Sequence, residues 1–248
     1  MIVVIGPACL TGSGETATPG SIADRIASAA AASGASVERV ARIGDDPAGD
    51  AWQLALSKAG IGHVAVLRDP TRPTRICPGD RAEADDGTSD ADDPLEVDPD
   101  AIDTDAIDPD APIGDDSAPS NDVTETFDGP VLDPADVGLA LRYLADYRIL
   151  VAVHPSADVA GAVMVAADWA GAQAVIVTGP GEPIPPTVPP GTLVVEAQAG
   201  DGSAPGLANR LGAYAAAIDR GVTAPKAFAG LTAELDGVGG PEAGPATT

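Results

Sequence analysis

Few side chains in this sequence could bind a metal or act as a nucleophile. The chain has two histidines and two cysteines: His63, His154, Cys9 and Cys77. The cysteines allow at most one disulfide, and none of the four has the spacing of a metal-ligand motif, so a structural zinc site is not expected. His154 follows a predicted strand, on the side where parallel sheets bind their ligands. A structural role is the simpler interpretation of a single histidine there.

A glycine-rich stretch near the N-terminus matches a dinucleotide-binding pattern. Gly12-Ser-Gly14-Glu-Thr-Ala17 has the form Gly-X-Gly-X-X-Ala. The pattern binds a pyrophosphate only when it forms a tight turn from a strand into a helix. Here it starts six residues beyond the preceding predicted strand and continues into Thr18-Pro19-Gly20. NAD binding is therefore not expected.

Acidic residues are concentrated in one part of the chain. Between Asp80 and Asp128 there are 19 acids and one base, and a five-residue repeat starts at Asp98, Asp103 and Asp108. The Asp-X-Asp pairs could attract divalent cations, but the glycine and the distal glutamate of an EF-hand loop are missing. A solvated low-complexity insertion is favoured over a metal site, because so few apolar residues cannot offset the entropy of ordering.

Composition excludes several classes of protein. The 248 residues are 44% hydrophobic and only 3% aromatic, so the core must consist of Ala, Val, Ile and Leu. A net charge of −25 with only two lysines repels nucleic acid and anionic membranes and is typical of a high-salt cytosol. No signal sequence and no apolar run of about 18 residues is present, so a soluble, cytoplasmic protein is expected.

Alternating strands and helices would position these residues. Strands are predicted at residues 2–5, 37–43, 63–67, 150–153, 174–178 and 192–195, and helices at 21–32, 47–59, 133–147, 156–170, 203–220 and 224–235. The alternation predicts an α/β fold with a mainly parallel sheet covered by helices on both faces. Residues 1–76 and 131–236 would form one domain, with a disordered insertion at 77–130 and a flexible tail at 237–248.

One series of residues resembles a known family. It comprises Arg42-Ile-Gly-Asp-Asp-Pro-Ala-Gly49, Leu56, Ala59-Gly-Ile61 and Arg68-Asp-Pro-Thr-Arg-Pro-Thr74. The series is similar to the signature of the PfkB, or ribokinase-like, carbohydrate kinases. Pro19-Gly-Ser-Ile-Ala-Asp24 and Val195-Glu-Ala-Gln-Ala-Gly-Asp201 match further segments of that family. Within the series, Asp45 and Asp46 are interpreted as a strand-to-helix turn with an architectural role.

The resemblance implies a ribokinase-like fold and ATP-dependent, Mg²⁺-assisted phosphoryl transfer to a hydroxyl of a carbohydrate or nucleoside. Ala199 and Gly200 would form an anion hole at a helix N-terminus, and Asp201 would be the catalytic base. Gly20 and Asp24 would contact the small-molecule substrate, and the loop at Gly179 would border the nucleotide. A monomer or a weak homodimer is expected.

The sequence also departs from the family pattern. Gln198 replaces the first glycine of the anion hole, and Asp24 replaces the usual asparagine. An alternative register places Gly206-Leu-Ala-Asn209 on the motif, which would put a neutral amide where the base should be. Only thirteen residues, Pro7 to Pro19, are available for the β-hairpin lid of the family, so the lid should be reduced or absent.

Two functions are consistent with these observations. The family-level interpretation is a divergent, shortened PfkB-like kinase of a salt-adapted organism, with Asp201 as base. The alternative is a catalytically inactive kinase-fold protein that binds a nucleotide or metabolite in a regulatory role, because several motifs are incomplete.

Overall fold

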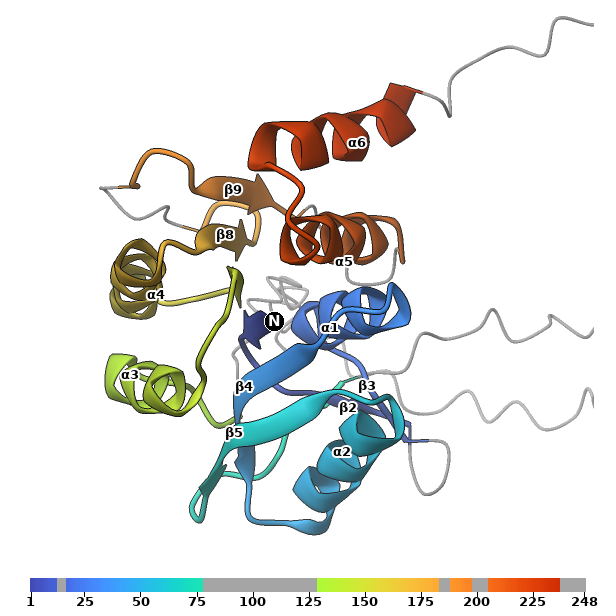
Figure 1. Cartoon of the computed structure of the whole chain (residues 1–248). Helices are drawn as coiled ribbons and strands as arrows, with labels where there is room; N and C mark the ends of the chain where they lie inside the picture. Colours follow the sequence, from blue (N-terminus) through green and yellow to red (C-terminus); the bar gives the residue numbers. More distant parts are fainter. Residues whose placement is uncertain (13–16, 78–128, 183–187, 198–204, 237–248) are drawn as a thin grey trace, which may run out of the picture. The chain divides into compact units, whose positions relative to one another are not determined.

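The computed structural model describes residues 1–12, 17–77, 129–182, 188–197 and 205–236 (Figure 1). Six parallel strands form the main sheet in the order β5-β4-β1-β7-β8-β9. They are β1 (Ile2–Ile5), β4 (Val37–Gly44), β5 (Gly62–Asp69), β7 (Ile149–Val153), β8 (Gln173–Thr178) and β9 (Leu193–Glu196). Helices cover both faces of this sheet, so the predicted α/β fold is confirmed.

The central strands bury both of their faces. In β1, Ile2 and Val4 belong to one hydrophobic cluster, whereas Val3 and Ile5 belong to the other. Successive side chains of a strand point to opposite faces, so a strand covered on both sides must be apolar throughout. This requirement explains the continuous apolar runs of β1 and β7, which are buried at every position.

The helices divide between the two faces as Figure 1 shows. On one side lie α1 (Ile22–Ala32), α2 (Pro47–Lys58) and α5 (Pro205–Asp219), with α6 (Ala224–Asp236) packed on α5; on the other lie α3 (Pro134–Tyr143) and α4 (Ala157–Ala170). Ser21 and Asp133 start their helices with capping boxes, which satisfy backbone N–H groups that have no partner within the helix. Helix α3 ends four residues earlier than expected, because Leu144 adopts an extended conformation and its side chain is buried.

The strand order of the main sheet reverses at one point. From β1 the chain builds outward through β4 and β5, and after residues 78–128 it returns to place β7 on the other side of β1. The strand order therefore reverses between β1 and β7. Ligands of open α/β sheets bind at such a switch point, beyond the carboxyl ends of the strands.

A second, small sheet follows β1 and consists of β2 (Leu10–Thr11), β3 (Thr18–Pro19) and β6 (Ile76–Cys77). Strands β2 and β3 form a short antiparallel pair, in which Leu10 lies opposite Pro19 and Thr11 opposite Thr18. A disulfide between Cys9 and Cys77 joins this pair to β6. With two residues in each strand, this sheet agrees with a reduced lid rather than an absent one.

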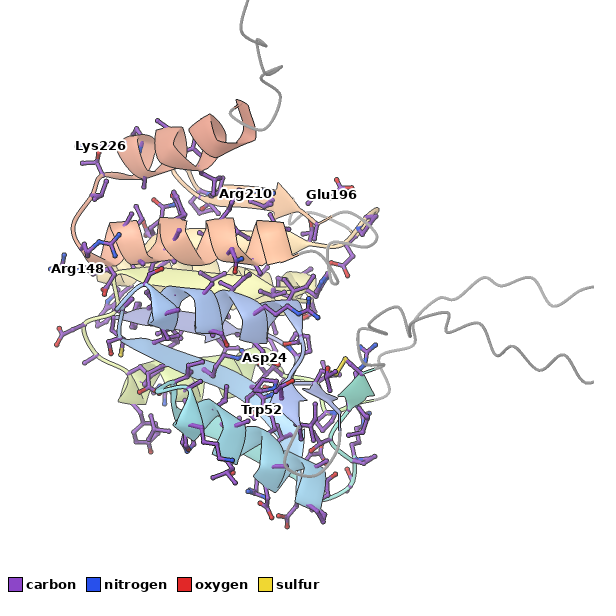
Figure 2. The ribbon with its side chains drawn as sticks, turned by 90° about the vertical axis from the view of Figure 1, so that its right-hand side faces the viewer. Asp24, Trp52, Arg148, Glu196, Arg210 and Lys226 are labelled. Carbon is purple, nitrogen blue, oxygen red and sulfur yellow. A yellow bond between two sulfur atoms is a disulfide. The ribbon has the colours of Figure 1, made fainter. Side chains whose placement is uncertain are left out.

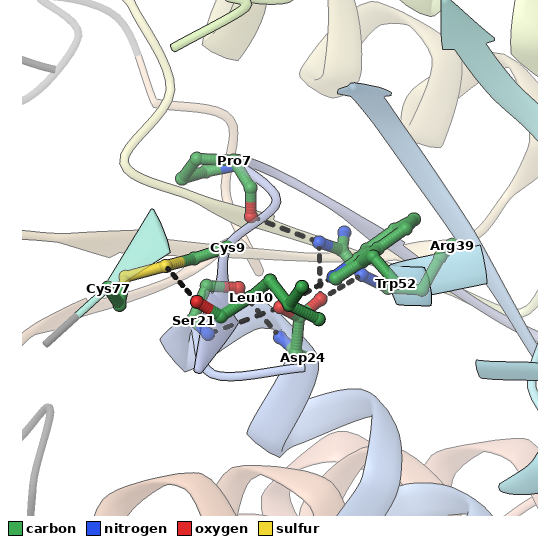
Figure 3. The surroundings of a disulfide bond; sticks show 8 residues. All are labelled: Pro7, Cys9, Leu10, Ser21, Asp24, Arg39, Trp52 and Cys77. Carbon is green, nitrogen blue, oxygen red and sulfur yellow. Dashed lines mark hydrogen bonds and ion pairs between the residues drawn. A yellow bond between two sulfur atoms is a disulfide. The ribbon is translucent and has the colours of Figure 1, made fainter. Parts of the chain in front are cut away.

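A buried ion pair links the first half of the sheet to its helices (Figure 3). Arg39 and Asp24 are both fully buried, and Nε and Nη2 of Arg39 donate to Asp24 Oδ1 over 3.0 and 2.9 Å. The guanidinium also donates hydrogen bonds to the carbonyl oxygens of Val4 and Pro7, at 2.9 and 3.1 Å. Asp24 Oδ2 accepts from Trp52 Nε1 at 3.2 Å, and the guanidinium lies 5.5 Å from the centre of the Trp52 ring. The network thus connects β1, β4, α1 and α2.

We predict that Asp24→Asn destabilises the protein by about 3–5 kcal/mol, because it leaves the Arg39 charge buried without a counter-ion. Asp50→Asn is the matched control, since it breaks an ion pair with Arg68 at the surface. The side chain of Asp50 is 68% exposed, so this pair should contribute little to stability. Urea unfolding followed by circular dichroism measures both. Equal effects of the two substitutions would contradict the dominant role of the buried pair.

Candidate functional site

The carboxyl ends of the six strands share one edge of the main sheet. The strands end there at Ile5, Gly44, Asp69, Val153, Thr178 and Glu196. The helices between the strands start at this same edge, so it also receives the N-termini of α1, α2, α3, α4 and α5. Because N-terminal helix turns carry partial positive charge and unpaired N–H groups, this edge favours an anionic ligand.

A histidine–glutamate pair lies at the switch point. His154 follows β7, and its Nδ1 lies 3.1 Å from both carboxylate oxygens of Glu182, in the loop after β8. The N–H of Gly179 donates to Glu182 Oε2 at 2.7 Å and fixes the carboxylate in turn. An ionised carboxylate only accepts hydrogen bonds, so this contact places a proton on Nδ1 of His154. The pair can therefore orient the imidazole ring toward a ligand.

The backbone at His154 supports a functional interpretation of the pair. Its φ of 47° lies in the left-handed region, which is uncommon for residues other than glycine and is concentrated at functional sites. A side chain at Gly179 would approach His154 Cε1 within 3.3 Å, so only glycine leaves this arrangement undisturbed. The sequence analysis gave His154 a structural role and missed Glu182. The available signal was an acid in the loop after the strand that follows His154.

Arg210 lies in the first half of α5 (Figure 2). Arg210 folds back along its own helix, so that a Cβ built on Gly206 would lie 3.3 Å from Nη1 of Arg210. The N–H groups of the first turn of α5 have no partner within the helix. A guanidinium beside such a turn is well suited to phosphate oxygens. The sequence analysis did not single out Arg210, because its folding back toward the helix start depends on the side-chain conformation.

The predicted anion hole and base, Ala199, Gly200 and Asp201, lie outside the described residues. Their segment, residues 198–204, immediately precedes α5 and follows the end of β9. The alternative register is described: Gly206 lies in the first turn of α5, and Asn209 is exposed. Both registers therefore place a motif at the start of α5, and both stay predictions.

The two predicted substrate residues are held by the protein itself. Gly20 donates its N–H to the carbonyl of Cys9 at 2.8 Å, and a Cβ at Gly20 would collide with the Thr11 side chain. Asp24 is 0% exposed, and both of its oxygens accept hydrogen bonds from the protein. In this conformation Asp24 offers no oxygen to a substrate, because it neutralises Arg39.

The turn at Asp45 and Asp46 has the expected architectural role. Asp46 Oδ1 accepts from the N–H of Gly49 at 2.7 Å, and Oδ2 accepts from the N–H of Thr74 at 2.6 Å. Oγ1 of Thr74 accepts from the N–H of Gly44 at 2.9 Å and donates to Asp46 at 2.8 Å. These bonds fasten the Pro-Thr end of the family-like series to the start of α2.

The structure also bears on the dinucleotide-binding pattern, on metal clusters and on membrane-spanning helices. Ala17 is followed by β3, and α1 begins only at Ile22, so the Gly12–Ala17 pattern does not enter a helix. Within the described parts of the chain, no three His, Cys, Asp or Glu side chains form a potential metal cluster. A helix capable of crossing a membrane is likewise absent from those parts. The acidic repeat lies outside the described residues.

Comparison with known proteins gives matches only in structure. No family model and no curated protein matches the sequence. An uncharacterized sugar kinase from Pyrococcus horikoshii matches 71% of the chain, at 12% identity and a TM-score of 0.44. A fructokinase with bound ATP from Xylella fastidiosa matches 94%, at 14% identity and a TM-score of 0.43. An aminoimidazole riboside kinase from Salmonella enterica matches 71%, at 12% identity and a TM-score of 0.40.

The chain spans only part of these proteins, covering 52%, 68% and 49% of their respective lengths. At such low identities and TM-scores, the superpositions are too loose to transfer a residue role or an activity to this chain.

Asp46 makes a pH-dependent contribution to stability. Burial raises its pKa, but hydrogen bonds from Thr74 and Gly49 outweigh burial and lower the pKa below the ordinary value of 3.8. A lowered pKa means that the stabilisation is present above the ordinary value and is lost as the pH falls through the folded-state value. We predict that wild type is more stable than Asp46→Asn at about pH 6, and that this difference shrinks toward about pH 2. Urea unfolding of both proteins across this range is the measurement, and a constant difference would contradict the assignment.

Proposed function

We propose that this chain is a PfkB-like kinase that transfers the γ-phosphoryl group of ATP to a hydroxyl of a carbohydrate or nucleoside. The close packing of α1 against α5 carries the proposal. A Cβ on Gly212 of α5 would lie 2.8 Å from the backbone nitrogen of Ala30 in α1, so the two helices are in close contact. Helix α1 follows the substrate-like segment and α5 follows the catalytic-motif segment. Both segments therefore lead into neighbouring helices at the carboxyl edge.

In the proposed site the protein mainly positions charge. The backbone at Ala199 and Gly200, the first turn of α5 and the guanidinium of Arg210 would hold the transferred phosphoryl group. Asp201 would accept the proton of the attacking hydroxyl. Gly179 and the pair of His154 with Glu182 would border the nucleotide.

ATP would supply the phosphoryl group, and Mg²⁺ would neutralise its charge. The described residues offer no cluster of three potential metal ligands. Phosphate oxygens and water would provide most of the ligands of Mg²⁺, as they commonly do in phosphoryl-transfer sites.

The second candidate is a non-catalytic protein that binds a nucleotide or metabolite at the same edge. Two observations favour it. Asp24 is engaged with Arg39 instead of facing a substrate, and the small sheet beside β1 has only two residues per strand. A reduced lid excludes water less completely, which matters for transfer but not for binding.

For the kinase we predict ADP release with Mg-ATP and pooled sugars and nucleosides in molar KCl, where screening relieves the repulsion of a chain with net charge −25. Asp201→Asn should abolish this turnover because an amide cannot accept the proton, whereas the exposed control Asp168→Asn should retain it. Turnover that survives Asp201→Asn would show that Asp201 is not the base. Absence of turnover in wild type, with intact nucleotide binding, would leave the non-catalytic function.

The role of Arg210 is tested by binding alone. We predict that Arg210→Met weakens ATP binding by about tenfold, because a charge-assisted hydrogen bond to phosphate is lost. Lys226→Met is the control, since it removes a cation from α6, which follows α5. Isothermal titration calorimetry gives both dissociation constants, and equal losses in the two variants would show a general charge effect only.

A further inference from the structure

The outer surface of α3 and α4 exposes large apolar side chains. Trp169 is 88% exposed, Tyr143 is 76% exposed and Val165 is 72% exposed. The chain contains only two tryptophans and three tyrosines, so the exposure of one of each on adjacent helices is a considerable share of its aromatic surface. Contiguous exposed apolar surface commonly marks a protein–protein contact.

Val165 and Trp169 line a groove between the two helices. The groove has a volume of ≈ 930 Å³ and is lined by both helices and by the turn after α3. Its apolar lining includes Leu141, Leu144, Ala162, Ala166 and Trp169. A large side chain at its rim and a hollow beside it give this face both parts of a self-complementary contact.

Two glycines line the same groove within helices. Gly138 lies in α3 and Gly161 lies in α4, and a Cβ at either position would meet no described atom within 4 Å. Glycine in a helix interior costs about 1 kcal/mol relative to alanine. Packing within the described part of the chain gives no reason for either glycine. A second helix lying closely in the groove would give one.

Charged groups at the two ends of this face are complementary. In α4, Asp158, Ala162, Val165 and Trp169 are spaced as one helix face, with the acid at its N-terminal end. Arg142 lies at the C-terminal end of α3, and its exposed guanidinium has no hydrogen bond or ion pair with a described residue. Both helices start at the carboxyl edge of the sheet, so an antiparallel partner would bring each Arg142 toward the Asp158 of the other copy.

We propose that a second copy of this chain covers the α3–α4 face in a two-fold symmetric homodimer. Trp169 of each copy occupies the groove of the other, and Arg142 pairs with Asp158 across the interface. Each copy carries a net charge of −25, which opposes association. Salt shortens the Debye length from about 10 Å at 0.1 M to about 3 Å at 1 M, so association strengthens with salt. This proposal does not depend on the kinase assignment.

Sedimentation equilibrium of the full chain in molar KCl tests the proposal. Wild type is expected at twice the chain mass, with weaker association in dilute salt. Gly161→Leu fills the groove and should raise the dimer dissociation constant at least about tenfold, although leucine is the better helix former and should not weaken the fold. Gly230→Leu is the matched control, because Gly230 is also an open helix-interior glycine but lies in α6.

A charge swap tests the geometry. Arg142→Asp should weaken the dimer, and adding Asp158→Arg should restore it. Three outcomes would overturn the proposal. They are a monomer at all salt and protein concentrations, a dimer unaffected by Gly161→Leu, and a monomer whose Trp169 is already shielded. Shielding of Trp169 is measured by comparing acrylamide quenching of tryptophan fluorescence in wild type and in Trp169→Phe. A shielded Trp169 in the monomer would show that another part of the same chain covers this face.

Discussion

A charge without access to water must be neutralised where it lies, and in this protein that constraint falls on Arg39. Its guanidinium is fully buried beside β1, so it takes the carboxylate of Asp24 and the carbonyls of Val4 and Pro7 as partners. These partners fix α1 against the sheet, and Trp52 brings α2 into the same network. The position of Gly20, directly before α1, depends on this pair. The same interaction removes Asp24 from the residues that could face a ligand.

The parallel arrangement of the strands determines which groups lie at the carboxyl edge of the sheet. Because all six strands end there, it collects the N-termini of the helices α1 to α5 and the loops that carry His154, Gly179 and Glu182. Its groups suit an anionic ligand, which agrees with a nucleotide and does not by itself distinguish catalysis from binding. The residues that would distinguish them belong to the segment 198–204, which precedes α5 in the sequence. The opposite helical layer has a different chemistry, with exposed aromatic side chains and unfilled space between α3 and α4.

Several features of the fold could be predicted because they depend on neighbouring residues. Continuous apolar runs predicted β1 and β7, and Asp133 before Pro134 marked the start of α3 through a local hydrogen bond. The architectural role of Asp46 was also predictable, since an acid before Pro47 is a common helix cap. The end of α3 could not be predicted, because Leu144 leaves the helix and buries its side chain against the sheet.

The sequence by itself determined the six strands of the main sheet and their parallel arrangement, the helices between them, the acidic composition and the family-like motifs, but not the short strands β2, β3 and β6. Only the tertiary structure decided that Asp24 is a buried counter-ion, that Glu182 orients His154 and that Trp169 is exposed beside a groove. Local patterns arise from interactions within a few residues, which can be read along the chain. Asp24 and Arg39, and His154 and Glu182, are 15 and 28 residues apart, and such pairs form only when the strand order places them together.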